Sequence, residues 1–80
     1  MTREEIFEGL SGAFEEVLGR PVVLREETTG TDVDGWDSVA HLMLILASER
    51  KFGVRFEGVE IANAANVGEF VSLIESKRNH

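Results

Sequence analysis

Apolar residues recur at helical spacing in three stretches of the chain, and polar or glycine-containing segments separate these stretches. The pattern predicts helices over residues 2–18, 38–52 and 67–77, with a short additional helix over 58–63. At 80 residues the chain has room for one small domain, over 1–80. The predicted fold is therefore all-α: a small four-helix bundle of three main helices and one short helix, with a long first loop.

Helix-end signals support these boundaries. Thr2 and Glu5 form a capping-box pattern, and Gly19 and Gly53 follow the first two main helices. Asn66 is the expected cap of the last helix. The expected buried residues of the first helix are Ile6, Phe7, Leu10, Ala13, Phe14, Val17 and Leu18. Those of the later helices are Val59, Ile61, Ala62, Val67, Phe70, Val71 and Ile74.

Glycines within the first helix and apolar residues within the connections interrupt this pattern. Gly9 and Gly12 lie inside the first helix, where each weakens it by up to about 1 kcal/mol relative to alanine. Residues 21–24 are apolar, but no second strand is present to pair with them, so we expect them to pin the loop to the helices. Val54 and Phe56 are the expected inward anchors of the second connection.

The helix over 38–52 has two apolar faces. One consists of His41, Leu44, Ile45, Ser48 and Phe52. The other consists of Val39, Leu42, Met43 and Leu46. Because the second face is the more hydrophobic, periodicity alone predicts that it lies in the core. The alternative is that both faces are largely buried in a tight bundle.

Asp37 and Ser38 stand where this helix begins, and both residue types suit a helix N-terminus. A phosphate on Ser38 would be stabilised by the helix dipole and by free backbone N–H groups. The alternative is that Ser38 is a plain N-cap. His41, three residues further on, either contacts such a phosphate or packs against its neighbours, and we favour packing.

The segment Asp37-Ser38-Val39, placed between a long loop and an apolar helix, resembles the attachment motif of acyl carrier proteins. The resemblance extends over nearly the whole chain and includes residues 52–56, 60–61 and 66–68. It implies that Ser38 carries a 4′-phosphopantetheine arm, whose thiol holds an acyl group as a thioester. It further implies that Asp37 is recognised by the transferase and that Trp36, Val39 and His41 flank the arm.

The resemblance also reverses the expected orientation of the helix over 38–52. In acyl carrier proteins the face equivalent to Leu44 points to the core and the acyl cavity, and the opposite face meets partner enzymes. The implied interface consists of Val39, Leu42, Met43, Leu46 and Glu49. The implied partners are a phosphopantetheinyl transferase and the enzymes that load and transfer acyl groups, in a fatty-acid, lipid or polyketide-type pathway.

The chain departs from the usual fatty-acid carrier in one respect. Such carriers have several acidic residues along this helix, whereas here Glu49 is the only one. The departure suggests a dedicated carrier that docks by more apolar contact. Trp36 beside the attachment site is either a contact anchor for a partner or packed onto the first loop.

Composition narrows the possible ligands. The net charge of −7 argues against nucleic acid and against anionic membranes. With no cysteine, any thiol must come from a prosthetic group. Asp32, Asp34 and Asp37 do not fit the spacing of a calcium loop, so we expect no metal site.

We find neither a signal peptide nor a membrane-spanning stretch, and we expect a cytoplasmic monomer.

There are three alternatives to an acyl carrier. An esterase using Ser38 and His41 would lack an oxyanion hole and an acidic partner, so we expect no enzyme activity. An aminoacyl or peptidyl carrier of a nonribosomal-peptide-like system would share the fold and the attachment chemistry. A helical adaptor without a prosthetic group would use Ser38 only as a cap. The many aliphatic residues on the helix over 38–52 favour acyl cargo.

Overall fold

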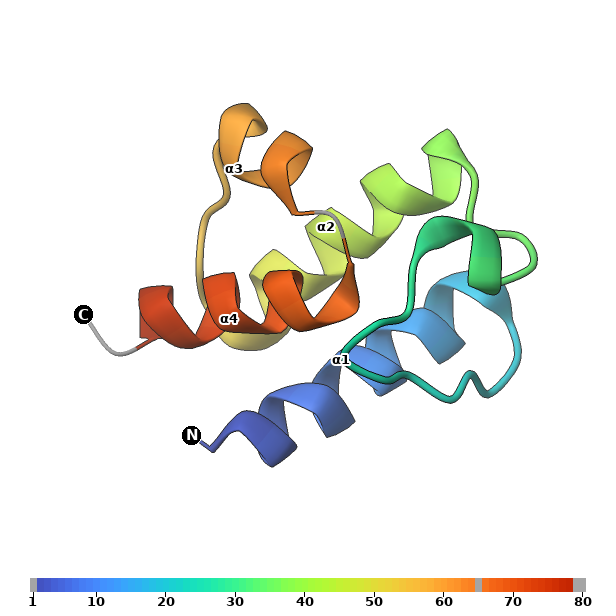
Figure 1. Ribbon diagram of the computed structural model, residues 1–80, viewed down its shortest axis with the longest axis horizontal. Coiled ribbons are helices and arrows are strands. Elements are labelled where there is room, and N and C mark those ends of the chain that lie inside the picture. Colours follow the sequence, from blue (N-terminus) through green and yellow to red (C-terminus); the bar gives the residue numbers. More distant parts are fainter. Residues whose placement is uncertain (1, 65, 79–80) are drawn as a thin grey trace.

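The computed structural model describes residues 2–64 and 66–78. Its helices are α1 (Arg3–Leu18), α2 (Ser38–Phe52), α3 (Gly58–Asn63) and α4 (Val67–Arg78), and a 3₁₀ turn at Gly30–Asp32 interrupts the long first loop (Figure 1). No strand occurs in the described part of the chain. The predicted all-α fold is confirmed. Helix α1 begins one residue later than expected because Thr2 is its cap, and α4 runs one residue further.

Local hydrogen bonds explain where the helices begin and end. The Glu5 N–H donates to Thr2 Oγ1 (3.2 Å), and the Thr2 N–H donates to Glu5 Oε1 (2.7 Å). Gly19 and Gly53 follow α1 and α2 as their C-caps, and their φ angles of 76° and 66° suit glycine. At the start of α4, Asn66 Oδ1 accepts from the Glu69 N–H (2.8 Å). The expected caps are therefore present.

Asp37, rather than Ser38, caps helix α2. The Asp37 backbone is extended, and its Oδ1 accepts a hydrogen bond from the Ala40 N–H (2.8 Å). Ser38 is the first residue inside the helix. The alternative in which Ser38 serves as the cap is therefore wrong, and its side chain is left without that structural task.

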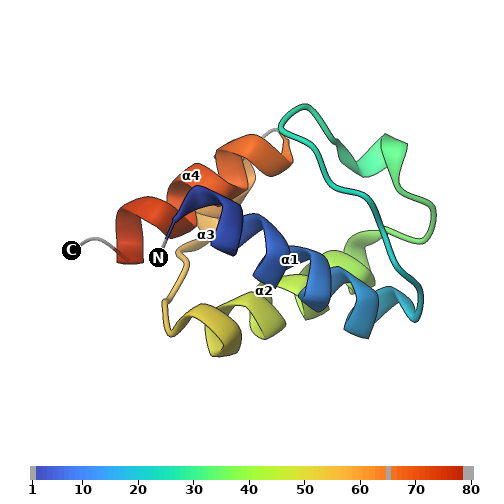
Figure 2. The ribbon, with the colours of Figure 1, turned by 90° about the horizontal axis from the view of Figure 1, so that it is seen from below.

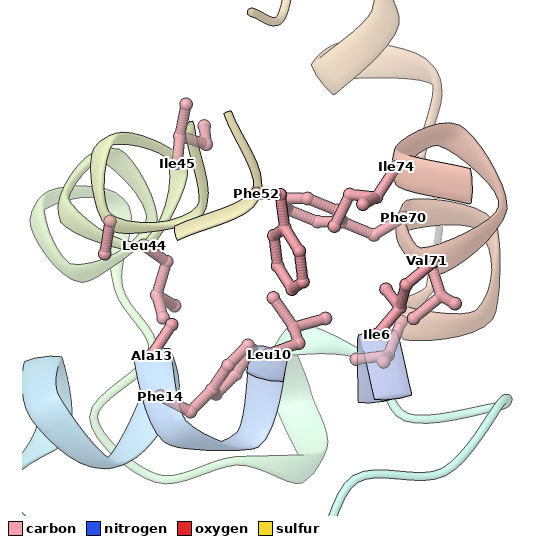
Figure 3. Packing of buried hydrophobic residues seen from close by; sticks show 12 residues of the cluster. Ile6, Leu10, Ala13, Phe14, Leu44, Ile45, Phe52, Phe70, Val71 and Ile74 are labelled. Carbon is pink, nitrogen blue, oxygen red and sulfur yellow. The ribbon is translucent and has the colours of Figure 1, made fainter. Parts of the chain in front are cut away.

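The hydrophobic core lies between α1, α2 and α4, because α1 packs against both other helices (Figure 2). Figure 3 shows Phe52 pointing from the end of α2 toward Leu10 of α1. Phe7, Val17 and Leu18 pack at its edge and are half-buried. The core cluster consists of Ile6, Leu10, Ala13, Phe14, Leu44, Ile45, Ala47, Phe52, Val67, Phe70, Val71 and Ile74. The buried residues predicted for the last helix are thus confirmed.

Gly9 makes room for Phe52. A Cβ atom on Gly9 would lie 2.9 Å from Phe52 Cζ, which is closer than such atoms approach in proteins. A Cβ atom on Gly12 would lie 2.8 Å from the Lys51 amine, at the free end of a flexible side chain. The glycine that weakens α1 locally is therefore needed for α2 to pack closely.

Arg3 of α1 ties the first loop to α4. Its guanidinium donates to the Glu26 carboxylate (2.7 Å), to Ser72 Oγ (3.0 Å) and to the Gly68 carbonyl (3.1 Å). It also pairs with Glu75 (3.2 Å). The hydrogen bond from Arg3 holds the pKa of Glu26 below its ordinary value. The Gly68 N–H in turn donates to the Glu26 carbonyl (2.9 Å), so the loop and α4 are joined directly.

The apolar residues of the connections divide between core and solvent. Residues 21–24 form no strand; Val22 and Leu24 pack against the core, whereas Val23 is 80% exposed. Val54 and Phe56 also pack against the core, as expected.

The apolar residues predicted for α3 differ in burial. The prediction that Val59 is buried is wrong, because its side chain is 63% exposed. Ile61 is the half-buried contact of α3, and the side chain of Ala62 lies outside the described residues.

Two glycine substitutions test the packing of α1 on α2. Gly12→Ala should raise the free energy of unfolding by up to about 1 kcal/mol, because the Lys51 amine can swing aside. Gly9→Ala should lower it by about 1 kcal/mol or more, because the buried Phe52 ring must shift. Urea denaturation of both variants measures this difference. Equal stabilisation by the two substitutions would contradict the close approach at Gly9.

The capping of α2 is tested by a second pair of variants. Asp37→Ala should lower the free energy of unfolding by about 1 kcal/mol, because the Ala40 N–H loses its acceptor. Ser38→Ala should change it by less than about 0.5 kcal/mol, as at an ordinary surface position. Thermal and urea unfolding provide the measurement. A larger loss for Ser38→Ala than for Asp37→Ala would show that Ser38 is the cap after all.

Candidate functional site

The Ser38 hydroxyl is exposed at the first turn of α2. Within residues 2–64 and 66–78 this hydroxyl makes no hydrogen bond, and the backbone N–H groups of Ser38 and Val39 have no acceptor either. These N–H groups lie at the positive end of the helix dipole. The site therefore offers a free hydroxyl beside donors that suit a phosphate.

Asp37 contributes a carboxylate next to this hydroxyl. Its Oδ1 is occupied by the Ala40 N–H, and for Oδ2 we find no hydrogen bond in the described part of the chain. The residue is exposed. One carboxylate oxygen thus stabilises the start of α2, while the other remains available to a partner.

Trp36 and His41 form a small aromatic cluster close to Ser38. The Trp36 ring packs edge-on against Phe14 of α1, with ring centroids 4.9 Å apart, and stacks on His41 at 5.9 Å. Trp36 Nε1–H donates to His41 Nδ1 (3.1 Å). Because Nδ1 is the acceptor, neutral His41 carries its proton on Nε2. Trp36 is therefore packed on α1 and α2, and the contact agrees with the packing role favoured for His41.

A hollow of about 340 Å³ lies beside these residues. Its lining brings together Trp36, Asp37, Ser38 and His41, four of the residues that the sequence indicated. Val39 is not in this lining and is 69% exposed. The remaining lining residues are Gly30, Ala64, Asn66 and Phe70. No sequence pattern indicated this second group, because its members come from the first loop, from the connection between α3 and α4, and from α4, and they approach Ser38 only in the fold.

Helix α2 buries one apolar face and exposes the other. Leu44, Ile45, Ser48 and Phe52 are buried, and the Ser48 hydroxyl donates to the Leu44 carbonyl (2.7 Å). On the opposite side the exposed fractions are 59% for Leu42, 49% for Met43 and 52% for Leu46. The prediction from periodicity is therefore wrong, as is the alternative in which both faces are buried. The orientation implied by the resemblance is the observed one.

Glu49, the only acidic residue of α2, is used within the chain. It is half-buried, and its Oε2 accepts a hydrogen bond from the Phe56 N–H (2.9 Å). This bond holds the connection after α2 against the helix. Glu49 was predicted to lie in the partner interface, but its carboxylate is engaged by the protein's own backbone.

Among the described residues, no three or more histidine, cysteine, aspartate or glutamate side chains gather where they could hold a metal ion, and this includes Asp32, Asp34 and Asp37. No helix in the same part of the chain is both long and apolar enough to span a membrane.

Comparison with known proteins identifies the family. No family model matches the chain. It is 36% identical over 75 residues to the acyl carrier protein of Acidothermus cellulolyticus, covering 92% of this chain and 89% of that one. It is 32% identical to the meromycolate extension acyl carrier protein of Mycolicibacterium smegmatis, covering 92% and 76% of the two chains.

A solved structure shows the same similarity in three dimensions. The solution NMR structure of the holo acyl carrier protein from Geobacter metallireducens superposes with a TM-score of 0.84 at 32% identity, over 90% of this chain and 84% of that one. Sequence and fold therefore agree over most of the length. The chain belongs to the acyl carrier protein family.

Proposed function

We propose that Ser38 is the attachment site of a 4′-phosphopantetheine arm, through which this acyl carrier protein holds its cargo. The observation that carries the proposal is the exposed, unbonded Ser38 hydroxyl at the first turn of α2, directly after the capping residue Asp37. A serine that caps its own helix would have its hydroxyl engaged by the backbone. Here the cap is supplied by the neighbouring residue, so Ser38 is free to be modified.

The surrounding residues fit a phosphodiester. The free N–H groups of Ser38 and Val39 can donate to its oxygens, and the helix dipole stabilises its charge. Trp36 and His41 line the adjacent hollow, where the first atoms of the arm have space. When attached, the arm supplies a thiol that carries the acyl group as a thioester. The chain has no cysteine of its own for this chemistry.

A phosphopantetheinyl transferase would attach the arm from coenzyme A. Ser38 Oγ attacks the phosphorus next to the pantetheine, the pyrophosphate bond of coenzyme A breaks, and adenosine 3′,5′-bisphosphate leaves. The hydroxyl proton passes to the transferase or to water. The second oxygen of Asp37, which α2 does not use, is positioned for recognition by the transferase.

The exposed face of α2 is proposed to dock the partner enzymes. Val39, Leu42, Met43 and Leu46 follow Ser38 along one side of the helix and are exposed. Exposed aliphatic residues that follow one another along a helix are typical of an interface. An enzyme bound there would have Ser38 at its edge. The aliphatic character of this face favours a dedicated acyl pathway with its own loading and transfer enzymes.

The alternatives explain the structure less well. The adaptor hypothesis needs Ser38 as a cap, a task that Asp37 performs. An esterase would need a carboxylate on His41 Nδ1, but this atom accepts from Trp36 Nε1. We therefore propose that the chain is a substrate of other enzymes rather than an enzyme. An aminoacyl or peptidyl carrier would share the attachment site, but the similar proteins are named acyl carrier proteins.

Intact mass spectrometry tests the attachment site. The wild type and the variants Ser38→Ala and Ser76→Ala are incubated with coenzyme A and a broad-specificity phosphopantetheinyl transferase. Ser76 is the matched control, because it is exposed on α4, away from any helix N-terminus. We expect one phosphopantetheine on the wild type and on Ser76→Ala, and none on Ser38→Ala.

A known acyl carrier protein in the same tube shows that the transferase is active. If that carrier is modified while the folded wild type is not, with this transferase and then with one from the protein's own source, the proposal fails. Modification of Ser38→Ala to the wild-type extent would place the arm on another residue.

A further inference from the structure

Positive charge collects at the C-terminal end of α2, in a chain whose net charge is −7. Arg50 and Lys51 lie in the last turn of the helix and Arg55 in the connection that follows, and all three are exposed. No carboxylate within the described residues forms an ion pair with any of them. Arg3 and Lys77, by contrast, are paired with acidic residues. The end of α2 is therefore a local exception to the acidic surface.

Glu49, the acidic residue of α2, also lines this end of the helix and offsets one of the three positive charges. Glu49 is half-buried, and its carboxylate is engaged by the Phe56 N–H at 2.9 Å. Lys51 extends toward α1, since its amine lies against the Gly12 backbone position. Arg50 lines a hollow that it shares with Glu16 of α1, and it also lines a second hollow together with Arg55.

These two arginines border an open groove of about 860 Å³, which we term the basic groove. Its apolar lining includes Leu46, which is 52% exposed, and the half-buried Val54. The complete lining consists of Leu46, Glu49, Arg50, Gly53, Val54 and Arg55. An apolar surface bordered by two guanidinium groups fits an aliphatic side chain flanked by carboxylates.

We propose that the basic groove docks a segment of a partner enzyme in which an aliphatic anchor is flanked by acidic residues. Burial of the anchor against Leu46 and Val54 would supply affinity, and Arg50 and Arg55 would supply selectivity, because a basic segment would meet like charges. That the partner belongs to an acyl pathway rests on the proposed function. The charge preference of the groove does not.

The groove lies at the opposite end of α2 from Ser38. Twelve residues separate Ser38 from Arg50, which is about 18 Å along the helix at ~1.5 Å per residue. A partner segment in the groove would therefore leave the Ser38 end of the helix clear. The selection of partners and the attachment of the arm can then use different parts of one helix.

Two synthetic helical peptides test the charge preference. Both carry the same central leucine, flanked by glutamates in one peptide and by lysines in the other. They are titrated into ¹⁵N-labelled Ser38→Ala protein, which lacks the proposed attachment site. We expect the acidic peptide to shift the amide signals of Leu46, Gly53, Val54 and Arg55 saturably, and the basic peptide to leave them unchanged.

Charge-reversal variants locate the effect. Arg50→Glu and Arg55→Glu should each weaken binding of the acidic peptide by about tenfold, as attraction becomes repulsion. Arg25→Glu is the matched control, because Arg25 is an exposed arginine of the first loop and its substitution changes the net charge equally. This control should change the dissociation constant of the acidic peptide by less than about twofold, because salt at physiological concentration screens charges that are distant from the groove.

Three results would overturn the proposal: equal or tighter binding of the basic peptide, no binding of the acidic peptide at millimolar concentration, or equal weakening by Arg25→Glu and Arg55→Glu. The test is separate from that of the attachment site. If the acidic peptide binds but the wild type is not modified, the docking role of the basic groove is supported and the proposed function is contradicted. If Ser38 is modified but the acidic peptide is not preferred, the proposed function is supported and the docking role of the basic groove is contradicted.

Discussion

The packing of Phe52 against the bare backbone at Gly9 determines how α2 sits in the bundle. The ring is fully buried, and a methyl group on Gly9 would lie 2.9 Å from its tip. Residues four apart share a helix face, so burial of Phe52 also buries Ser48 and Leu44. The opposite face, with its exposed aliphatic residues, is thereby turned to solvent. One contact between two helices thus decides which side of α2 is available to other proteins.

A second set of contacts fixes where α2 begins. Arg3 and the backbone of Gly68 hold the first loop at Glu26, and the ring of Trp36 holds it against Phe14. Between these two anchors the loop reaches Asp37 in the extended conformation that a cap requires. Because Asp37 satisfies the first turn, the Ser38 hydroxyl has no structural partner. The length of the loop is therefore explained by the position in which it places Ser38.

The sequence predicted the helices because their signals are local. The capping pair Thr2 and Glu5, the terminal glycines and the helical spacing of apolar residues all act within a few residues of one another. The orientation of α2 was not predictable in this way. Both faces of α2 are apolar, so its own sequence does not show which one is buried. Gly9, whose contact with Phe52 determines the orientation, lies in α1, and the sequence indicated only that it weakens that helix. The family resemblance supplied that orientation. The partners of Trp36 and Glu49 were missed for the same reason: Phe14 and Phe56 approach them only through the fold.

Methyl NMR in the presence of a soluble paramagnetic agent tests the orientation of α2 most directly. Leucine methyl groups are well suited, because Leu42 and Leu46 lie on the exposed face and Leu44 on the buried one. Leu10, which is fully buried in α1, serves as the internal reference. We expect strong relaxation enhancement at Leu42 and Leu46 and little at Leu44 and Leu10. Enhancement at Leu44 equal to or above that at Leu42 and Leu46 would contradict the orientation on which the docking face depends.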